Sequence, residues 1–300
     1  MIVYNNKNNI LSEIKEKNFK LEKDIQKIFE SNLKSVMRLE VVKSEFSIKN
    51  KRIDTLAFDR EAKAFVIIEY KRDKSHSVVD QGISYLNLML EHKADFLIEY
   101  NEGMKDILKR DEIDWSQSKV CFVSSSFTEN QRTATNFKDL AIELWEIKQF
   151  ENGLVLIDSV KKSPSAPSIK QISANNQSLE KLTNEIKVYT EEDLLERGTE
   201  ESRYLYEQFK NAILNLDADI DLQPKKEYMA FKKGKNIVDM TILRKGIKLW
   251  INLKKGILDD PKKIMEDVSG KGHWGNGDYQ AIVDSDKDLE YIMSLIKQAL

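Results

Sequence analysis

The sequence predicts an α/β protein of two domains: a mixed β-sheet flanked by helices, followed by a smaller α+β domain with an antiparallel sheet. Three observations support this prediction. Helical and strand-like apolar patterns alternate over the first 160 residues, a stretch poor in large apolar residues and containing Pro164 and Pro167 follows, and the last third carries short strand patterns separated by glycine turns. We therefore expect domains at 1–160 and 186–300, joined by a linker at 161–185.

The first domain is expected to begin with an amphipathic helix, because apolar residues recur at helical spacing from 20 to 34. Runs rich in Val, Ile and Phe, bounded by polar residues, predict its strands at 39–48, 52–58, 65–70, 96–100, 119–124 and 141–147. Two further helices are expected at 79–92 and 128–139. Helix, three-strand meander, helix and strand together indicate a mixed sheet between helices.

The second domain is expected to begin at a helix capped by Thr190, since threonine before an acidic first turn is a common helix start. A longer helix is expected over 203–215 and a terminal helix over 286–300. Glycine turns separate three strand candidates, at 227–232, 236–243 and 247–253. A glycine-rich loop at 269–277 precedes a further short strand.

The composition favours a soluble globular protein, with 41% hydrophobic and 33% charged residues and a net charge of -2 over 300 residues. No stretch approaches the ~18 apolar residues that a membrane span requires, and no signal peptide is recognisable, so we expect a cytoplasmic protein. The single cysteine, Cys121, excludes an intramolecular disulfide framework and a cysteine-clustered zinc site. It lies in an apolar run and is expected in the core.

Three charged residues in neighbouring strand candidates are the main functional signal. Glu69 and Lys71 are two residues apart in one strand and therefore project from the same face. If the preceding strand pairs antiparallel, Asp54 lies beside them at the end of the sheet. Two carboxylates and an ammonium group are what Mg²⁺-assisted phosphodiester hydrolysis needs, because hard cations prefer oxygen ligands and a lysine offsets developing negative charge. A cross-strand salt bridge without catalytic function explains the same residues equally well.

These residues resemble the D…(D/E)xK core of the PD-(D/E)xK nuclease superfamily, which has the restriction-endonuclease-like fold. The resemblance covers about residues 20 to 125, although Ile53 stands where the family motif has proline. It implies that Asp54 and Glu69 ligate Mg²⁺ or Mn²⁺ and that Lys71 positions or activates water. It also implies that Glu22, on the early helix, is a further metal ligand and that Gln81 positions Lys71 or a backbone phosphate.

Two other acidic residues, Glu30 and Glu45, are alternatives to Glu22 as the first acid of the site. The second half of the chain resembles an uncharacterised module that is often fused to nuclease-like domains and is sometimes labelled a predicted transport protein. Its hallmark here is Asp259-Asp-Pro261 followed by the motif at 267–278. This resemblance implies no chemistry, and we discount the transport label because no segment could cross a bilayer.

The second domain carries a local excess of basic residues that could face a polyanion. The nucleic-acid-binding candidates from this region and the glycine-rich loop are Lys232, Lys233, Lys235, Lys271 and His273. Successive glycines can expose backbone N–H groups to an anion, and Trp274 could provide a stacking face. A tight structural loop over a solvated sheet face is the alternative interpretation.

The sequence therefore predicts a metal-dependent nuclease that hydrolyses phosphodiester bonds, of DNA rather than RNA. A non-catalytic nucleic-acid-binding or interaction protein on a degenerate nuclease scaffold is the alternative. A third hypothesis is a small-molecule or peptide-binding protein centred on the glycine-rich loop. No membrane partner is expected. Cleavage of both strands of a duplex would call for two active sites and therefore a homodimer.

Overall fold

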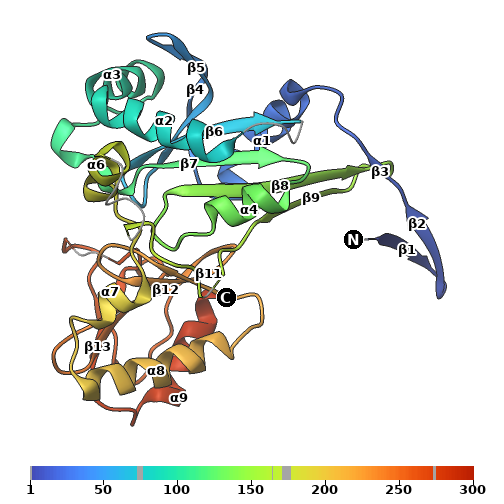
Figure 1. The fold of residues 1–300 in the computed structure, drawn as a ribbon. Helices are drawn as coiled ribbons and strands as arrows, with labels where there is room; N and C mark the ends of the chain where they lie inside the picture. The colour runs from blue at the N-terminus through green and yellow to red at the C-terminus, as the bar shows by residue number, and fades with distance from the viewer. Residues whose placement is uncertain (1, 73–76, 164, 171–176, 273–274) are drawn as a thin grey trace. The chain divides into compact units, whose positions relative to one another are not determined.

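The computed structural model describes residues 2–72, 77–163, 165–170, 177–272 and 275–300. The chain divides into two compact units, Met1–Val188 and Tyr189–Leu300 (Figure 1). The stretch that the sequence marks as a linker contributes Ile169, Leu179 and Leu182 to the core of the first unit. The apolar residues of this stretch are few, but Leu179 and Leu182 lie three residues apart in a helix, and both are buried.

The N-terminal unit is built on a mixed seven-stranded sheet. The strand order is β3-β8-β7-β6-β5-β4, and β9 also pairs with β8. β6, β7 and β8 run parallel, whereas β4, β5 and β6 form an antiparallel meander. The strands are β3 (Glu16–Lys17), β4 (Glu40–Ile48), β5 (Lys51–Asp59), β6 (Ala64–Lys71), β7 (Lys119–Ser124), β8 (Ile142–Phe150) and β9 (Val155–Ser159).

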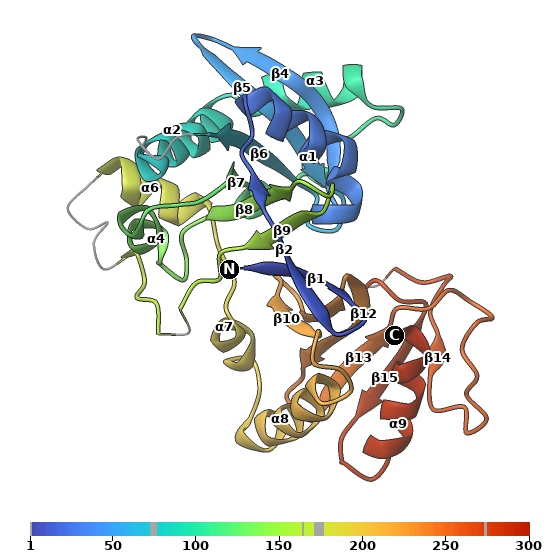
Figure 2. The same cartoon turned by 90° about the vertical axis from the view of Figure 1, so that its right-hand side faces the viewer.

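Helices cover both faces of this sheet (Figures 1 and 2). On one face, Phe29 of α1 packs with Ile68 and other residues of one core cluster. On the other face, Leu86 of α2 packs with Ile67 in a second cluster. The α-helices of this unit are α1 (Glu22–Met37), α2 (Val78–Glu91), α3 (Lys93–Gly103), α4 (Glu129–Thr135) and α6 (Gln177–Glu185), and two short 3₁₀ turns are η1 (Arg110–Glu112) and η2 (Trp115–Gln117).

The strand expected at 96–100 was wrong, because these residues belong to the helix α3. Phe96 and Tyr100 are both buried and lie four residues apart, which is one helical turn. A short apolar run does not distinguish a strand from a helix segment, and here contact with the sheet decided for the helix. Cys121 lies in the core, as expected, with no exposed surface.

The C-terminal unit is an antiparallel six-stranded sheet with helices on one face. The strand order is β10-β11-β12-β13-β15-β14. Its strands are β10 (Asp221–Pro224), β11 (Met229–Lys233), β12 (Lys235–Ile242), β13 (Ile247–Ile251), β14 (Glu266–Asp267) and β15 (Tyr279–Val283). Its helices are α7 (Glu191–Leu195), α8 (Glu200–Leu214) and α9 (Leu289–Ile296), with a final 3₁₀ turn, η3 (Lys297–Ala299). Thr190 caps α7, as predicted, by accepting a hydrogen bond from the N–H of Asp193.

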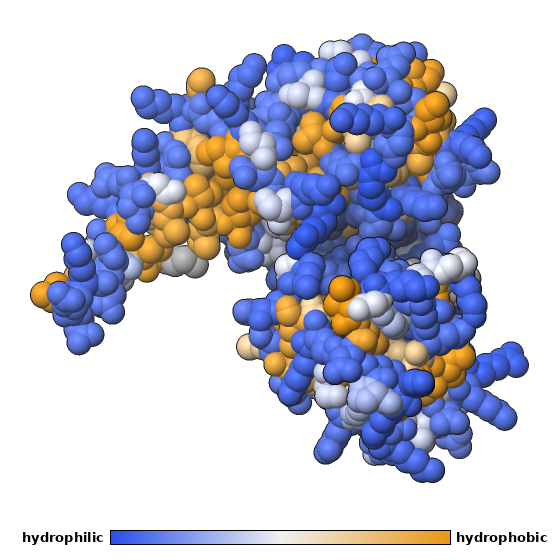
Figure 3. All heavy atoms as spheres, turned by 180° about the vertical axis from the view of Figure 1, so that it is seen from behind, coloured by the Kyte–Doolittle hydropathy of each residue, from blue (hydrophilic) through white to orange (hydrophobic). Residues whose placement is uncertain are grey.

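A separate two-stranded hairpin precedes the main sheet, formed by β1 (Val3–Lys7) and β2 (Ile10–Ile14). Its side chains are largely exposed, including the apolar residues Ile10 and Leu11. The sequence analysis did not expect this element, because its pattern is weakly apolar. On the face shown in Figure 3, hydrophilic residues predominate, and hydrophobic side chains gather in patches.

The predicted fold class is confirmed: a mixed sheet flanked by helices is followed by a smaller unit with an antiparallel sheet. Within the described residues, no helix has both the length and the apolar character needed to span a bilayer.

Candidate active site

The meander of β4, β5 and β6 brings the predicted acids to one end of the sheet. β5 and β6 are in antiparallel register from Thr55 opposite Ile68 onward. Asp54 and Glu69 each lie one residue beyond that pair. Because side chains alternate along a strand, Glu69 and Lys71 project on the same face as Ile67, toward α2.

The contacts of Asp54, Glu69 and Lys71 show that these residues converge. Lys71 Nζ lies 2.9 Å from Glu69 Oε1. The N–H of Tyr70, between them in the strand, donates to Asp54 Oδ2 at 3.0 Å. The paired strands thus place two carboxylates and an ammonium group together, as the sequence suggested.

The helix α2 adds two hydrogen-bonding groups to this cluster. Gln81 Nε2 lies 2.9 Å from Glu69 Oε1 and 3.2 Å from the hydroxyl of Tyr85. The Tyr85 hydroxyl lies 3.1 Å from Glu69 Oε2 and 3.2 Å from the carbonyl oxygen of Arg52. Ser77 caps the helix by accepting from the N–H of Asp80, which fixes the first turn before Gln81.

Tyr85 belongs to this hydrogen-bonded cluster, and the sequence analysis missed it. Its spacing of four residues from Gln81 places both side chains on one helix face, which is the signal that could have identified it. Burial, and then the charge of Glu69, raise the pKa of Tyr85 far above its usual value. The phenol therefore stays protonated and remains a hydrogen-bond donor.

The electrostatics of the cluster are unbalanced toward negative charge. Burial and then the charge of Glu69 raise the pKa of Asp54 from 3.8 to about 6, against the opposing effects of the Tyr70 N–H and Lys71. Glu45, whose carboxylate lies 3.0 Å from the guanidinium of Arg52, adds further negative charge near Asp54. One lysine thus does not offset the carboxylates around it.

The donor atoms fit a hard divalent cation in part. Asp54 Oδ1 accepts no hydrogen bond from the described residues, whereas Glu69 Oε1 already accepts two and Oε2 lies near Tyr85. In the part of the chain that the structure covers, no group of three or more His, Cys, Asp and Glu residues could hold a metal ion. Two carboxylates are nevertheless sufficient for Mg²⁺, which commonly takes one or two protein carboxylates together with waters and substrate phosphates.

Glu22 lies on α1, which packs against the opposite face of the sheet. Its Oε1 accepts a hydrogen bond of 2.8 Å from the backbone N–H of Arg72, directly after Lys71. Glu30, an alternative first acid on the same helix, binds the hydroxyl of Thr55 and the amide of Gln26. None of the described contacts joins either glutamate to the carboxylate of Asp54 or Glu69.

The basic candidates of the C-terminal unit fall at two places in its sheet. Lys232, Lys233 and Lys235 lie around the turn between β11 and β12, where Lys233 pairs with Asp217. Lys271 pairs with Glu266 of β14, at the other edge of the strand order. His273 and Trp274 lie outside the described residues. The described contacts do not join these lysines into one cluster.

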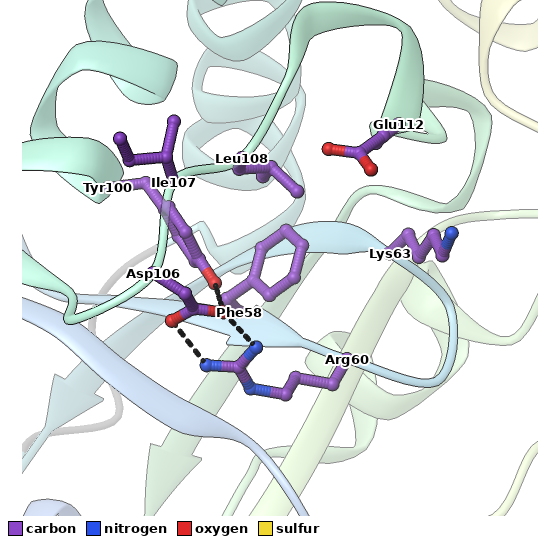
Figure 4. A pocket seen from close by; sticks show the side chains of 8 residues that line it. All are labelled: Phe58, Arg60, Lys63, Tyr100, Asp106, Ile107, Leu108 and Glu112. Atoms are coloured by element: carbon purple, nitrogen blue, oxygen red, sulfur yellow. Dashed lines mark hydrogen bonds and ion pairs between the residues drawn. The ribbon is translucent and has the colours of Figure 1, made fainter.

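A cavity of about 210 Å³ lies at the opposite end of β5 from the acids (Figure 4). Its lining includes Arg60, Lys63 and Tyr100. The guanidinium of Arg60 forms two hydrogen bonds with Asp106, at 2.6 and 3.0 Å, and a further ion pair with Glu40. Arg60 is therefore already neutralised, and the cavity is separate from the acid cluster.

Comparisons with solved structures return partial and distant similarities. The structure titled "EndoMS-dsDNA2 complex" is 17% identical, covers 38% of this chain and 40% of that chain, and has a TM-score of 0.26. A repair endonuclease from Pyrococcus abyssi is 15% identical over 40% of this chain and 44% of that chain, with a TM-score of 0.23. SfsA of Pyrococcus furiosus, in complex with Ca²⁺, is 14% identical over 47% of this chain and 63% of that chain, with a TM-score of 0.24.

Sequence comparisons give one match to the C-terminal part of the chain and one to the whole chain. Residues 190–300 match the family model described as a domain of unknown function (DUF5655). An uncharacterized protein of Haemophilus influenzae is 56% identical over 300 residues, which is 100% of this chain and 99% of that protein. The chain belongs to the same family as this Haemophilus influenzae protein.

Proposed function

We propose that the N-terminal unit hydrolyses phosphodiester bonds of nucleic acid, DNA in preference to RNA, with Mg²⁺ or Mn²⁺ as cofactor. The observation that carries this proposal is the convergence of Asp54, Glu69 and Lys71 at one end of the sheet, with Gln81 and Tyr85 of α2 fixing Glu69. The raised pKa of Asp54 supports it, because an excess of buried negative charge favours binding of a cation.

Exposed cations beside the acids support a phosphate-bearing substrate. Lys49, Lys51 and Arg52 are exposed at the hairpin that joins β4 to β5. Arg52 is two residues before Asp54, which is about 7 Å along an extended strand. Phosphate groups are held mainly by such lysine and arginine side chains, so this hairpin suits a nucleic-acid strand that crosses the site.

In the proposed reaction, Asp54 and Glu69 hold the cation, which supplies Lewis acidity and an activated water when bound. Lys71 orients the attacking water and offsets the negative charge that develops on the phosphate. Gln81 and Tyr85 donate to Glu69 and keep its carboxylate in one orientation. Glu22, a metal-ligand candidate from the sequence, acts on the backbone after Lys71.

The decisive experiment is cleavage of supercoiled plasmid, linear duplex, single-stranded DNA and RNA, with Mg²⁺, Mn²⁺ or EDTA. Wild type is compared with Lys71→Ala and with Lys27→Ala, which removes an exposed lysine of α1 as a matched control. We expect metal-dependent cleavage by wild type and Lys27→Ala, and its loss in Lys71→Ala. Wild-type cleavage by a folded Lys71→Ala protein would contradict the proposal.

One observation favours the alternative of a non-catalytic nucleic-acid-binding protein on the same scaffold. Glu69 is only 5% exposed, and the side chain of Lys71, which pairs with it, is 11% exposed. A covered ion pair of this kind can serve the fold alone. Binding of DNA that weakens with salt, without cleavage of any of the four substrates, would decide for this alternative.

A further inference from the structure

Three polar residues of α1 form a stripe that faces the sheet from the side opposite to the acid cluster. Glu22, Gln26 and Glu30 are spaced four residues apart and therefore lie along one face of the helix. The buried residues Ile25 and Phe29 flank them on the face that packs on the sheet. Gln26 is buried, Glu30 is half-buried and Glu22 is exposed. Buried polar groups need hydrogen-bond partners, and all three side chains find partners in, or directly after, the strands that carry the site.

Each residue of the stripe contacts a strand next to a site residue. Glu22 accepts from the N–H of Arg72 at 2.8 Å, one position beyond Lys71. Gln26 Nε2 donates to the carbonyl oxygen of Asp54 at 3.0 Å. Glu30 accepts from the hydroxyl of Thr55, one position beyond Asp54.

The hydrogen bond from Gln26 meets the backbone at a position, Asp54, that the strand registers pass over. The register of β4 with β5 pairs Ser44 with Thr55 and Phe46 with Ile53, and it passes over Asp54. The register of β5 with β6 begins only at Thr55. Glu45, which would face Asp54 in a regular ladder, has a φ of 55°, in the left-handed region. Neither register thus pairs Asp54 with a residue of β4 or β6.

Gln26 is almost completely buried, with 6% of its surface exposed. Its amide lies within hydrogen-bond distance of Glu30 Oε1 and Ser44 Oγ, both at 3.1 Å, as well as of the Asp54 carbonyl. An apolar residue would fill the same volume at lower desolvation cost. The amide therefore has a role that packing alone does not explain.

We propose that Gln26 is a positioning residue, which fixes the orientation of Asp54 from behind the sheet by holding its carbonyl. Two hydrogen bonds then fix the orientation of Asp54. Gln26 donates to its backbone carbonyl, and the Tyr70 N–H donates to its carboxylate. Glu22 acts in the same way on the backbone that follows Lys71. The catalytic consequence rests on the proposed function, whereas the orientation of Asp54 does not.

The test variant is Gln26→Met, which keeps the length of the side chain and removes the donor. Gln26→Glu, which also lacks the donor when ionised, is the second variant if Gln26→Met does not fold. Ser44→Ala is the matched control, because it removes another partner of Gln26 and leaves the contact with Asp54. Thr55→Val is a second control, which weakens the same buried network without touching the Asp54 carbonyl.

The first readout is hydrogen exchange of the Tyr70 amide, measured by NMR on the full chain without metal. Because this amide donates to Asp54, we expect its protection to fall at least about 10-fold more than that of other β6 amides in Gln26→Met. A purely structural role would change all β6 amides together, as we expect for Thr55→Val. Unchanged relative protection of Tyr70 would overturn the inference, whether or not the protein cleaves nucleic acid.

The second readout is Mn²⁺ affinity by calorimetry, together with kcat and KM on duplex DNA. A displacement of about 1 Å in a reacting group can cost about 100-fold in rate, so we expect a fall of 10-fold to 100-fold in kcat with little change in KM. We expect Mn²⁺ affinity to weaken at least 5-fold in Gln26→Met and to stay unchanged in Ser44→Ala. Wild-type affinity and kcat in Gln26→Met would overturn the catalytic role while the proposed function stood. Absence of cleavage and of Mn²⁺ binding in wild type would refute the proposed function alone.

Discussion

The N-terminal sheet contains a partly buried aspartate, Asp54, and the C-terminal sheet a fully buried one, Asp239, and the two carboxylates have very different hydrogen-bond partners. Asp239 of β12 has no exposed surface, and its carboxylate accepts hydrogen bonds from the Asn236 amide and from both the backbone and side-chain N–H groups of Asn276. Asp54 of β5 accepts one N–H and has a second carboxylate, Glu69, close enough to raise its pKa.

This difference shows that burial of an acid does not by itself indicate a functional site. The three donors to Asp239 offset its charge locally and tie the glycine-rich loop to the sheet, which is a structural role. Among the described contacts, Asp54 accepts one N–H, and a single cation, Lys71, contacts the neighbouring Glu69. That deficit is what a metal ion or a protonated substrate group can remove.

The largest expected contrast is catalytic. We expect Asp54→Asn to lower metal-dependent cleavage by ~10³-fold, because a ligand and a local charge are lost. Asp239→Asn is expected to keep the cleavage rate within about 3-fold, since that carboxylate serves only the C-terminal loop. Initial rates on a short duplex at 20 °C measure both. Equal losses of cleavage rate in the two variants would contradict the view that Asp54 is catalytic and Asp239 structural.

For stability, the larger effect is expected from the loss of Asp239. Asp239→Ala leaves partly buried donors of Asn236 and Asn276 without their acceptor, so we expect the free energy of unfolding of the C-terminal unit to fall by about 1 to 3 kcal/mol. The measurement is hydrogen exchange of β11, β12 and β13 peptides in the full chain. Protection of β4, β5 and β6 peptides serves as the internal control and should not change. Unaltered exchange in β12 would show that Asp239 does not pin the loop.

Two glycines of the same loop offer a matched test of its structural role. A Cβ at Gly277 would lie 1.8 Å from the carbonyl oxygen of Ile251, whereas a Cβ at Gly270 would meet no atom within 4 Å. We expect Gly277→Ala to lower the free energy of unfolding by about 2 to 3 kcal/mol. Gly270→Ala is expected to change it by less than about 0.5 kcal/mol. Urea denaturation of the full chain measures both. A tolerated Gly277→Ala would favour a loop that serves a ligand.

The raised pKa of Asp54 predicts that the stability of the protein depends on pH. A folded-state pKa of about 6, above 3.8, means that Asp54 contributes stability below about pH 4 and that this stability is lost as the pH rises through 6. Relative to Asp54→Asn, wild type should lose up to about 3 kcal/mol between pH 4 and pH 7. Denaturation at several pH values without metal tests this. A constant difference would contradict the charge deficit, and addition of Mn²⁺ at pH 7 should restore the loss.

The sequence determined most of the elements that carry the site. Runs rich in Val, Ile and Phe, bounded by polar residues, predicted β4, β5 and β6, and helical spacing predicted α1 and α2, because both signals are local in the chain. The strand expected at 96–100 failed because a short apolar run has no decisive period, and the hairpin of β1 and β2 gave no signal because its side chains are exposed.

The residues of the acid cluster could be named from the sequence, but their roles could not. Spacing in a strand put Glu69 and Lys71 on one face, and only strand pairing brought Asp54 to them. The sequence likewise named Glu22 and Gln81. The tertiary structure placed Gln81 on Glu69 and Glu22 on the backbone after Lys71, because these contacts depend on which helix packs on which face of the sheet.

The sequence by itself determined most of the elements and their order, because periodicity, caps and turns act over a few residues. Only the tertiary structure decided how many hydrogen-bond donors meet the carboxylates of Asp54 and Asp239. Asp54 and Asp239 look alike as single letters between strand residues. Their difference arises from partners that are remote in the chain: Glu69 and Gln26 for Asp54, Asn276 for Asp239. Such contacts carry no local signature, since the distance between side chains is set by the packing of whole elements.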